Sequence, residues 1–185
     1  MDIVNEALTI IYWKDKLSGY PVIDGDNISG FSEESYVIEK TDLSYFYKLT
    51  EADDEAEFTI LLSVFGMLTQ RYFKECSLIC SASAVFKAEF PLFYEIRPMA
   101  DHTIREFVGE VRTEVENVAQ HLDCSTGDLQ GENLSHFHFV YGTAVKGHFG
   151  NADFSMKVEE VKWESLSLTI RFSNKFVDGG VVRHF

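Results

Sequence analysis

The run from Glu57 to Phe73, EFTILLSVFGMLTQRYF, constrains the fold of this chain more than any other feature. Its apolar side chains reach every side of a helical wheel, so a helix here must be covered by other elements all round. Thr50 and Asp53 precede it as a candidate side-chain cap, and acids in the first turn favour the positive end of the helix dipole. Three hydroxyl side chains interrupt the run, which is also too short for a membrane span. The sequence therefore predicts a buried central helix in a globular domain.

The composition narrows the class of protein. The chain has 185 residues, with 16 Lys and Arg against 30 Asp and Glu, a formal net charge of -14. Nucleic acids and anionic membranes bind basic surfaces, so this balance argues against both as partners. Three cysteines lack zinc-ribbon or redox spacing, and the first residues carry acids where a signal peptide would be basic. We therefore expect reduced thiols and a cytoplasmic protein built as one domain or one lobe of a larger one.

Several shorter elements are predicted before the central helix. Residues 3–17 have apolar side chains at helical spacing, and residues 20–35 contain Pro and Gly among polar residues, which is typical of an extended connector. Residues 35–39 are predicted to form a short strand, and Thr41-Asp42 can cap a short helix over residues 43–49.

After the central helix the pattern alternates between strands and one helix. Residues 77–83 and 93–97 are predicted strands, and residues 103–122 form the best amphipathic helical pattern in the chain, which should lie on a sheet.

Residues 136–141 and 166–172 alternate apolar and polar side chains as half-buried strands do. Residues 154–163 supply a third strand that can pair with 166–172. Its apolar face changes phase between Val158 and Val161, which predicts a bulge. The fold class is therefore α/β in the α+β two-layer sense, a mixed β-sheet with helices packed on it.

In this order the segments resemble the condensation domains of nonribosomal peptide synthetases, within the chloramphenicol-acetyltransferase-like superfamily. Residues 12–19, YWKDKLSG, are similar to the YWKxxLxG stretch that begins the second half of such a domain. His121-Leu122-Asp123 falls on the family's HQD, just after a predicted helix. The other similar stretches are residues 58–65 (FTVLLAAF in the family), 90–97 (FVNTLVLR), 103–118 (SFRELLxRVRE), 136–141 (FQVMFVL) and 172–185 (YSTDLFD and the following helix).

The chain also departs from that family. The resemblance runs from about Trp13 to the end and covers only the second of two lobes, and the HHxxxDG motif of the first lobe is absent. Leu92-Phe93 replaces the family's Asn-Thr, and residues 125–127 replace its PFE. The resemblance therefore implies a crossover helix and connector over residues 1–34 and the C-terminal lobe over residues 35–185.

The activity implied by the resemblance is amide-bond formation between carrier-protein-bound thioesters. No catalytic residue is expected in this chain, and the fragment is expected to be inactive alone. The implied partners are an N-terminal condensation lobe, a peptidyl carrier protein bearing phosphopantetheine, and an adenylation domain in the parent chain. The candidate tunnel or lobe-interface residues are His121, Asp123, Arg97 and Phe93.

Each candidate site has a structural alternative. By the resemblance, His121 and Asp123 border the lobe interface, where a His and an Asp at a helix end can hold a loop by hydrogen bonds to backbone groups. The structural alternative is a histidine whose positive charge suits the negative C-terminal end of the helix. His136 and His138 stand two apart, so a strand would place both on one face, where a metal could bind with a nearby carboxylate. No third ligand follows from the spacing, so a solvated or interface-facing pair is the preferred interpretation, and no metal is predicted. Asp178-Gly179 echoes the end of HHxxxDG but is interpreted as a turn.

Two other functions remain open. The chain could be a non-catalytic module whose exposed face binds a carrier protein or a partner lobe. It could also be a small acyltransferase that completes its site by oligomerising, but that hypothesis calls for a HxxxD motif, and no His here has an Asp four residues later.

Overall fold

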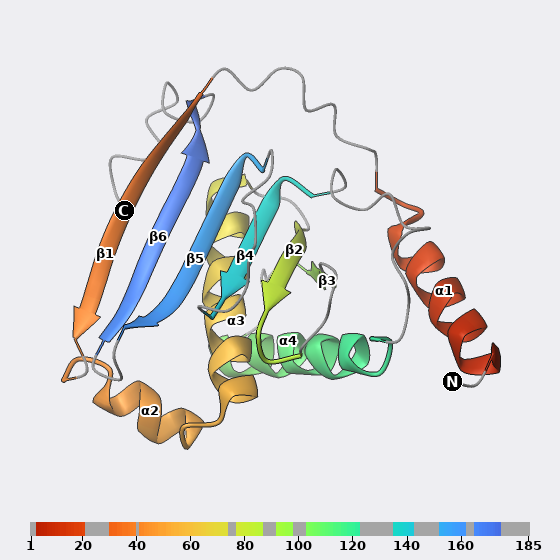
Figure 1. The fold of residues 1–185 in the computed structure, drawn as a ribbon, viewed down its shortest axis with the longest axis horizontal. Coiled ribbons are helices and arrows are strands. Elements are labelled where there is room, and N and C mark those ends of the chain that lie inside the picture. The colour runs from red at the N-terminus through yellow and green to blue at the C-terminus, as the bar shows by residue number, and fades with distance from the viewer. Residues whose placement is uncertain are drawn as a thin grey trace.

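The computed structural model describes residues 3–20, 30–39, 41–73, 77–86, 92–97, 103–122, 135–142, 152–161 and 165–174. Within these residues, helices and strands follow each other in a mixed order (Figure 1). The helices are α1 (Ile3–Leu17), α2 (Ser44–Thr50), α3 (Asp54–Phe73) and α4 (Ile104–Ala119). The strands are β1 (Phe31–Glu39), β2 (Ser77–Ser83), β3 (Leu92–Ile96), β4 (Phe137–Tyr141), β5 (Phe154–Val161) and β6 (Ser165–Ser173). None of these helices combines the length and apolar composition that a bilayer crossing requires.

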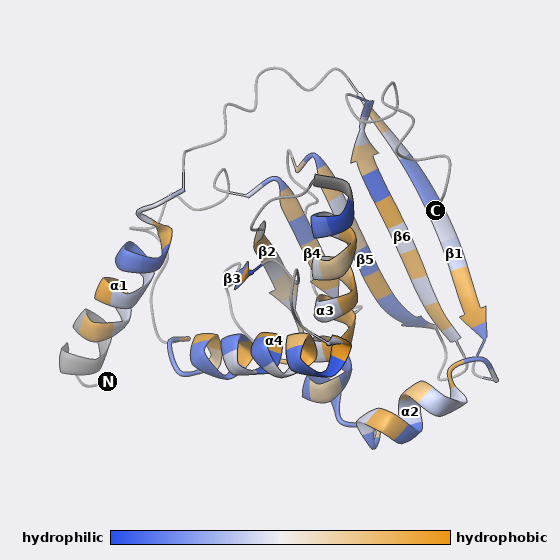
Figure 2. Ribbon diagram, turned by 180° about the vertical axis from the view of Figure 1, so that it is seen from behind, coloured by the Kyte–Doolittle hydropathy of each residue, from blue (hydrophilic) through white to orange (hydrophobic). Residues whose placement is uncertain are grey.

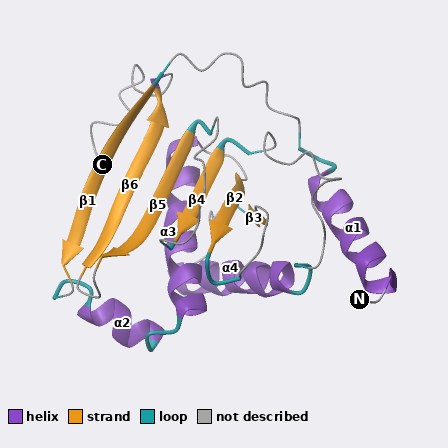
Figure 3. Cartoon of the chain, viewed as in Figure 1, coloured by secondary structure: helices purple, strands orange, loops and turns teal. Residues whose placement is uncertain are grey.

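The described strands form one mixed sheet in the order β1-β6-β5-β4-β2-β3. The strands β2, β4 and β5 run parallel to each other, and the remaining neighbours are antiparallel. Figures 2 and 3 show the sheet with α3 and α4 on one of its faces. The predicted fold class, a mixed sheet with helices packed on it, is confirmed.

The central helix α3 packs its aromatic side chains directly onto the sheet. Phe58 and Phe65 are fully buried, and the ring of Phe65 lies 5.4 Å from that of Phe154 and 5.7 Å from that of Phe139, measured between centroids. At Gly66 the backbone comes so close to the sheet that an added Cβ would lie 2.8 Å from the Ile96 side chain. The apolar pattern that predicted this helix therefore reflects its packing against the sheet and α4, but the cover is not complete all round, because Val64 is 39% exposed.

The helix starts agree with the sequence, with two corrections. The predicted Thr41-Asp42 cap is wrong, because Leu43 holds the N-cap position of α2 and no side chain caps that helix. Asp53 caps α3, because its Oδ1 accepts a hydrogen bond from the Ala56 amide at 2.8 Å. Thr50, the other half of the predicted cap, instead donates its hydroxyl to Glu57 Oε1 at 3.3 Å. At α4, Thr103 and Glu106 form a capping box, with each side chain bonded to the other residue's amide.

Two strand predictions need adjustment. The predicted bulge in residues 154–163 is wrong, since the pairing of β5 with β6 continues in regular register from Phe154 to Val161. Glu160 takes the position opposite Leu166 on the core face, where the sheet ends and a charged side chain reaches solvent.

The strand predicted at residues 35–39 begins earlier, at Phe31. It follows Gly30, whose φ of 129° favours glycine, and the Gly30 carbonyl accepts from the Asn174 amide.

Candidate functional site

The predicted site residue His121 lies at the junction of α1 with the end of α4. Its ring stacks on Tyr12 with centroids 3.8 Å apart and an interplanar angle of 7°, and its Nδ1 lies 2.7 Å from the Asn117 carbonyl oxygen. Its own carbonyl oxygen accepts a hydrogen bond from Trp13 Nε1 at 3.0 Å. Trp13 is only 1% exposed, so His121 takes part in a closely packed junction between α1 and α4, called the joint below. These contacts of His121 are with α1 and with the last turn of α4.

An ion pair completes the same joint. Lys16 of α1 pairs with Glu114 of α4, and their side chains are 7% and 19% exposed. Glu114 Oε1 also accepts a hydrogen bond from the Glu95 amide at 2.8 Å, on the outer edge of β3. The Glu114 carboxylate therefore pairs with the buried Lys16 ammonium and accepts the hydrogen bond of an amide on an edge strand. These two interactions connect α1, α4 and β3.

The other predicted site residues are divided between the two ends of β3. Phe93 is 2% exposed and its ring lies 6.4 Å from that of Trp13, so the structure brings it together with His121 through the Trp13 side chain. Arg97 lies four residues further along, roughly 13 Å away at strand spacing. Its exposed guanidinium pairs with Glu95 at 3.6 Å, and its carbonyl oxygen accepts from Gln70 Nε2. Asp123 and Asp178-Gly179 lie outside the described residues.

A buried carboxyl, which the sequence pattern marks only as an acid at a helix start, is at the centre of a second cluster. Glu57 is 7% exposed, and its Oε2 accepts from the Tyr141 hydroxyl at 3.0 Å while Oε1 accepts from Thr50. Burial raises the pKa of Glu57, with the two hydrogen bonds opposing that shift and Asp54 and Glu160 adding to it. The signal that could have revealed it is an acid placed directly against the apolar run of the central helix.

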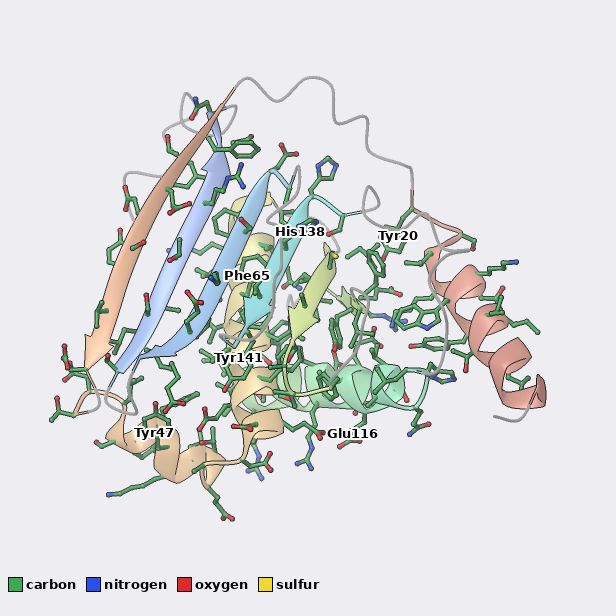
Figure 4. All side chains as sticks on the ribbon, viewed as in Figure 1. Tyr20, Tyr47, Phe65, Glu116, His138 and Tyr141 are labelled. Carbon is green, nitrogen blue, oxygen red and sulfur yellow. The ribbon has the colours of Figure 1, made fainter. Side chains whose placement is uncertain are left out.

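The two tyrosines near Glu57 share its desolvated surroundings. Burial, and then the Glu57 charge, raise the pKa of Tyr141 well above its ordinary value. Burial, and then Glu57 and Glu160, also raise the pKa of Tyr47. Both phenols therefore stay protonated as hydrogen-bond donors. In Figure 4, Tyr141 and Tyr47 lie toward the lower end of the sheet, where β2, β4 and β5 end, while His138 lies toward the upper end.

A third cluster lies at that upper end, where β4 and β5 begin and β6 ends. His136 Nδ1 lies 2.5 Å from Asp153 Oδ2, and Asp153 Oδ1 accepts from the Ser173 hydroxyl at 3.2 Å. Asp153 is the nearby carboxylate that the metal hypothesis for His136 and His138 called for. Among the described residues, however, no group of three His, Cys, Asp or Glu side chains is placed to hold a metal ion. The spacing of the histidines points to His136, but no local pattern points to Asp153, which is 17 residues further along the chain.

Comparisons with known proteins agree with the fold. No family model and no curated protein sequence matches this chain at a significant level. Among solved structures, the cyclization-docking bidomain of EpoB from Sorangium cellulosum superposes with a TM-score of 0.68 at 11% identity, covering 95% of this chain and 46% of its own. The starter condensation domain of rhizomide synthetase gives 0.62 at 12% identity, with 92% of this chain and 47% of its own covered.

A third match comes from a complex of the X-domain and OxyB from teicoplanin biosynthesis, with a TM-score of 0.64 at 14% identity. It covers 97% of this chain and 51% of the matched one. This chain thus has the fold found in condensation-domain structures, and it spans about half the length of the three structures named here.

Proposed function

We propose that this chain is the C-terminal lobe of a condensation-type domain. It would supply one wall of the tunnel in which a carrier-bound amine attacks a carrier-bound thioester. The observation that carries the proposal is the superposition of nearly the whole chain on about half of such domains. The first lobe, carrying HHxxxDG, is then the partner, and the phosphopantetheine arms of carrier proteins deliver both substrates. An adenylation domain that loads the carrier fits the same arrangement.

The joint between α1 and α4 supports this proposal from inside the chain. A helix that crosses from one lobe to the other must be fixed to the second lobe if the lobes are to keep one relative position. Here Trp13, Lys16 and Tyr12 fix α1 by burial, an ion pair and a ring stack. Under the proposal, His121 and Phe93 act as positioning residues of the lobe interface, while Arg97 reaches the exposed end of β3.

The test is a reconstitution. This chain is titrated with a separately produced first lobe that carries HHxxxDG, and binding is measured by calorimetry. The mixture is then assayed for amide formation with aminoacyl carrier proteins. Saturable binding with amide formation supports the proposal. No binding by a folded, monomeric chain contradicts it.

A second candidate function is a binding module without catalysis. It is favoured by the absence of HHxxxDG from the chain and by the match to a complex between an X-domain and another protein, OxyB. The same titration separates the two candidates, because a module would bind a carrier or lobe without any amide product.

A further inference from the structure

The two edges of the sheet differ in how far the rest of the chain covers them. At one edge β3 has five residues, and its Glu95 amide donates to the Glu114 carboxylate of α4. At the other edge β1 has nine residues, and Figures 1 and 3 show no helix or strand of the described chain beyond it. Residues 33–37 of β1 are all exposed. The outward-facing side of residues 31–39, called the β1 edge below, is therefore open.

An open edge of this length presents backbone groups that the sheet itself does not pair. Alternate residues of an edge strand point their N–H and C=O groups away from the neighbouring strand, so nine residues present about four such pairs. The backbone of an added strand can bond to each of them. Among the described residues, the backbone bonds of β1 outside its pairing with β6 lie at its end, where the Glu39 carbonyl accepts from the Asp42 and Leu43 amides. The middle of the β1 edge is therefore accessible to another strand.

The charges of the β1 edge are all negative. Glu33, Glu34 and Glu39 are the charged residues of this strand, and no described residue forms an ion pair with any of them. Arg171 stands opposite Glu33 in the register, but its guanidinium lies over the Phe31 ring, 3.7 Å from the ring centroid. The three carboxylates therefore favour a neighbouring strand that carries Lys or Arg.

Between these acids, apolar side chains stand on both faces of β1. Tyr36 is 40% exposed and continues a row with Leu168 and Val158 on the face that carries α3. Val37, on the opposite face, is 62% exposed. A strand added beyond β1 would place its own side chains beside these two and cover them. The pattern therefore fits an extended segment in which apolar residues lie between basic ones.

We propose that the β1 edge binds an extended, basic segment of a partner protein, which adds to the sheet as a further antiparallel strand. Lys or Arg side chains of that segment lie opposite the three glutamates, and its apolar side chains lie opposite Tyr36 and Val37. A second copy of this chain fits less well, since its own β1 brings three more acids to the contact and each copy has a net charge of -14. This inference does not rest on the proposed function, because it concerns the edge of the sheet opposite the joint between α1 and α4.

The first experiment uses a synthetic probe. Its nine residues, acetyl-Lys-Val-Val-Val-Thr-Lys-Lys-Thr-Val-amide, are the antiparallel complement of residues 31–39, with Lys opposite each Glu. Fluorescence anisotropy of the labelled peptide, titrated with the full chain, measures its binding. Replacing the three Lys by Glu should weaken binding by about tenfold or more, because three opposite-charge pairs become like-charge pairs. No binding of the Lys peptide, or equal affinity of the two peptides, would overturn the proposal.

The second experiment separates strand addition from simple attraction between charges. Two further versions of the Lys peptide carry N-methyl groups, one at the odd positions and the other at the even positions. Alternate amides of a strand point to the same neighbour, so only one of these two sets faces β1. One version should therefore lose about tenfold or more in affinity, since several hydrogen bonds are blocked, while the other stays close to the parent peptide. Equal affinities of the two versions would contradict strand addition.

The third experiment locates the contact on the chain. Glu33→Lys combined with Glu34→Lys should lower the affinity for the Lys peptide several-fold. Glu110→Lys combined with Glu116→Lys is the matched control, an equal change of charge at exposed positions of α4, and should leave the affinity nearly unchanged. Thermal unfolding first verifies that both double variants are folded. Similar losses in both would mean that only the net charge matters, which overturns the proposal.

Hydrogen exchange of the wild-type chain, followed by NMR, completes the test. The bound Lys peptide should slow the exchange of alternate amides within residues 31–39, because these amides become donors to the added strand. Slower exchange elsewhere in the chain without any change in β1 would overturn the proposal. So would a chain that dimerises through β1 and thereby excludes the peptide, since a second copy would then be the occupant of the edge.

Discussion

Two polar clusters lie at opposite ends of the same strand, β4, and they differ in how solvent reaches them. At one end the Glu57 carboxyl is buried, and Tyr141 and Thr50 each donate to one of its oxygens. At the other end Asp153 is nearly buried, but the imidazole bound to it is half exposed. Both carboxyls are held by hydrogen bonds. The difference teaches that a hydrogen-bonded carboxyl alone does not indicate a reactive site. A carboxyl that orients an exposed acid-base group can indicate one.

The largest expected effect is on stability at the Glu57 end. Glu57→Ala should lower the free energy of unfolding by about 2 to 4 kcal/mol, because it leaves a small cavity and removes the acceptor of the Thr50 and Tyr141 hydroxyls. His136→Ala should cost less than about 1 kcal/mol, since half of its side chain already faces solvent. Urea unfolding of both variants measures the contrast. Glu55→Ala, an exposed acid in the same helical turn, is the control, and similar losses at Glu57 and His136 would break the comparison.

The Glu57 end should also show a pH dependence. Burial raises its pKa above the ordinary value of 4.5, so the folded state favours the protonated carboxyl. The stabilisation is therefore complete below pH 4.5 and is lost as the pH rises through the raised pKa of the folded state. Glu57→Gln removes this contribution. The free energy of unfolding of wild type, minus that of Glu57→Gln, should therefore decrease as the pH increases from 4 to 8. A difference that stays constant over this range would show that the carboxyl is not desolvated.

Tyr141→Phe should have a moderate effect. It removes the hydroxyl that donates to Glu57 Oε2 and leaves the carboxyl with Thr50 as its remaining donor among the described residues. We expect a loss of about 1 to 3 kcal/mol in the free energy of unfolding, measured by urea titration at pH 7. Because a charged Glu57 needs its donors more than a neutral one, the loss should shrink at pH 4. A larger loss at pH 4 than at pH 7 would contradict this account.

The smallest effect is expected at the other end. Ser173→Ala removes one donor to Asp153, while Asp153 keeps its bond to His136, so the expected loss is about 0.5 to 1.5 kcal/mol. The Nδ1–H tautomer of His136, measured by long-range proton–nitrogen correlation spectra, should persist, since the bond that selects it is intact. Loss of that tautomer in Ser173→Ala would mean that Ser173 does more than support the carboxylate.

Periodic local patterns predicted much of this fold correctly. The central helix, the amphipathic helix over residues 103–122 and the strands around residues 77–83, 93–97, 136–141 and 166–172 all appear in the structure with small shifts at their ends. These elements could be predicted because side chains repeat every 3.6 residues in a helix and every two in a strand, so burial of one face appears in neighbouring residues.

The candidate site was harder to predict. Phe93 and His121 each contact Trp13, a residue that the candidate list did not include. The phase change in residues 154–163 suggested a bulge, yet the strand is regular and simply ends with Glu160 at the edge of the core. A local pattern cannot separate these alternatives, because both produce the same order of polar and apolar residues.

By itself, the sequence determined the helices, the strands and the need for a mixed sheet with the central helix packed on it. Only the tertiary structure decided which polar side chains meet, because those contacts join residues that are distant in the chain. Tyr141 reaches Glu57 across 84 positions, and Asp153 reaches His136 across 17. The strand order and register create both contacts, and these depend on pairing between segments that no local periodicity encodes.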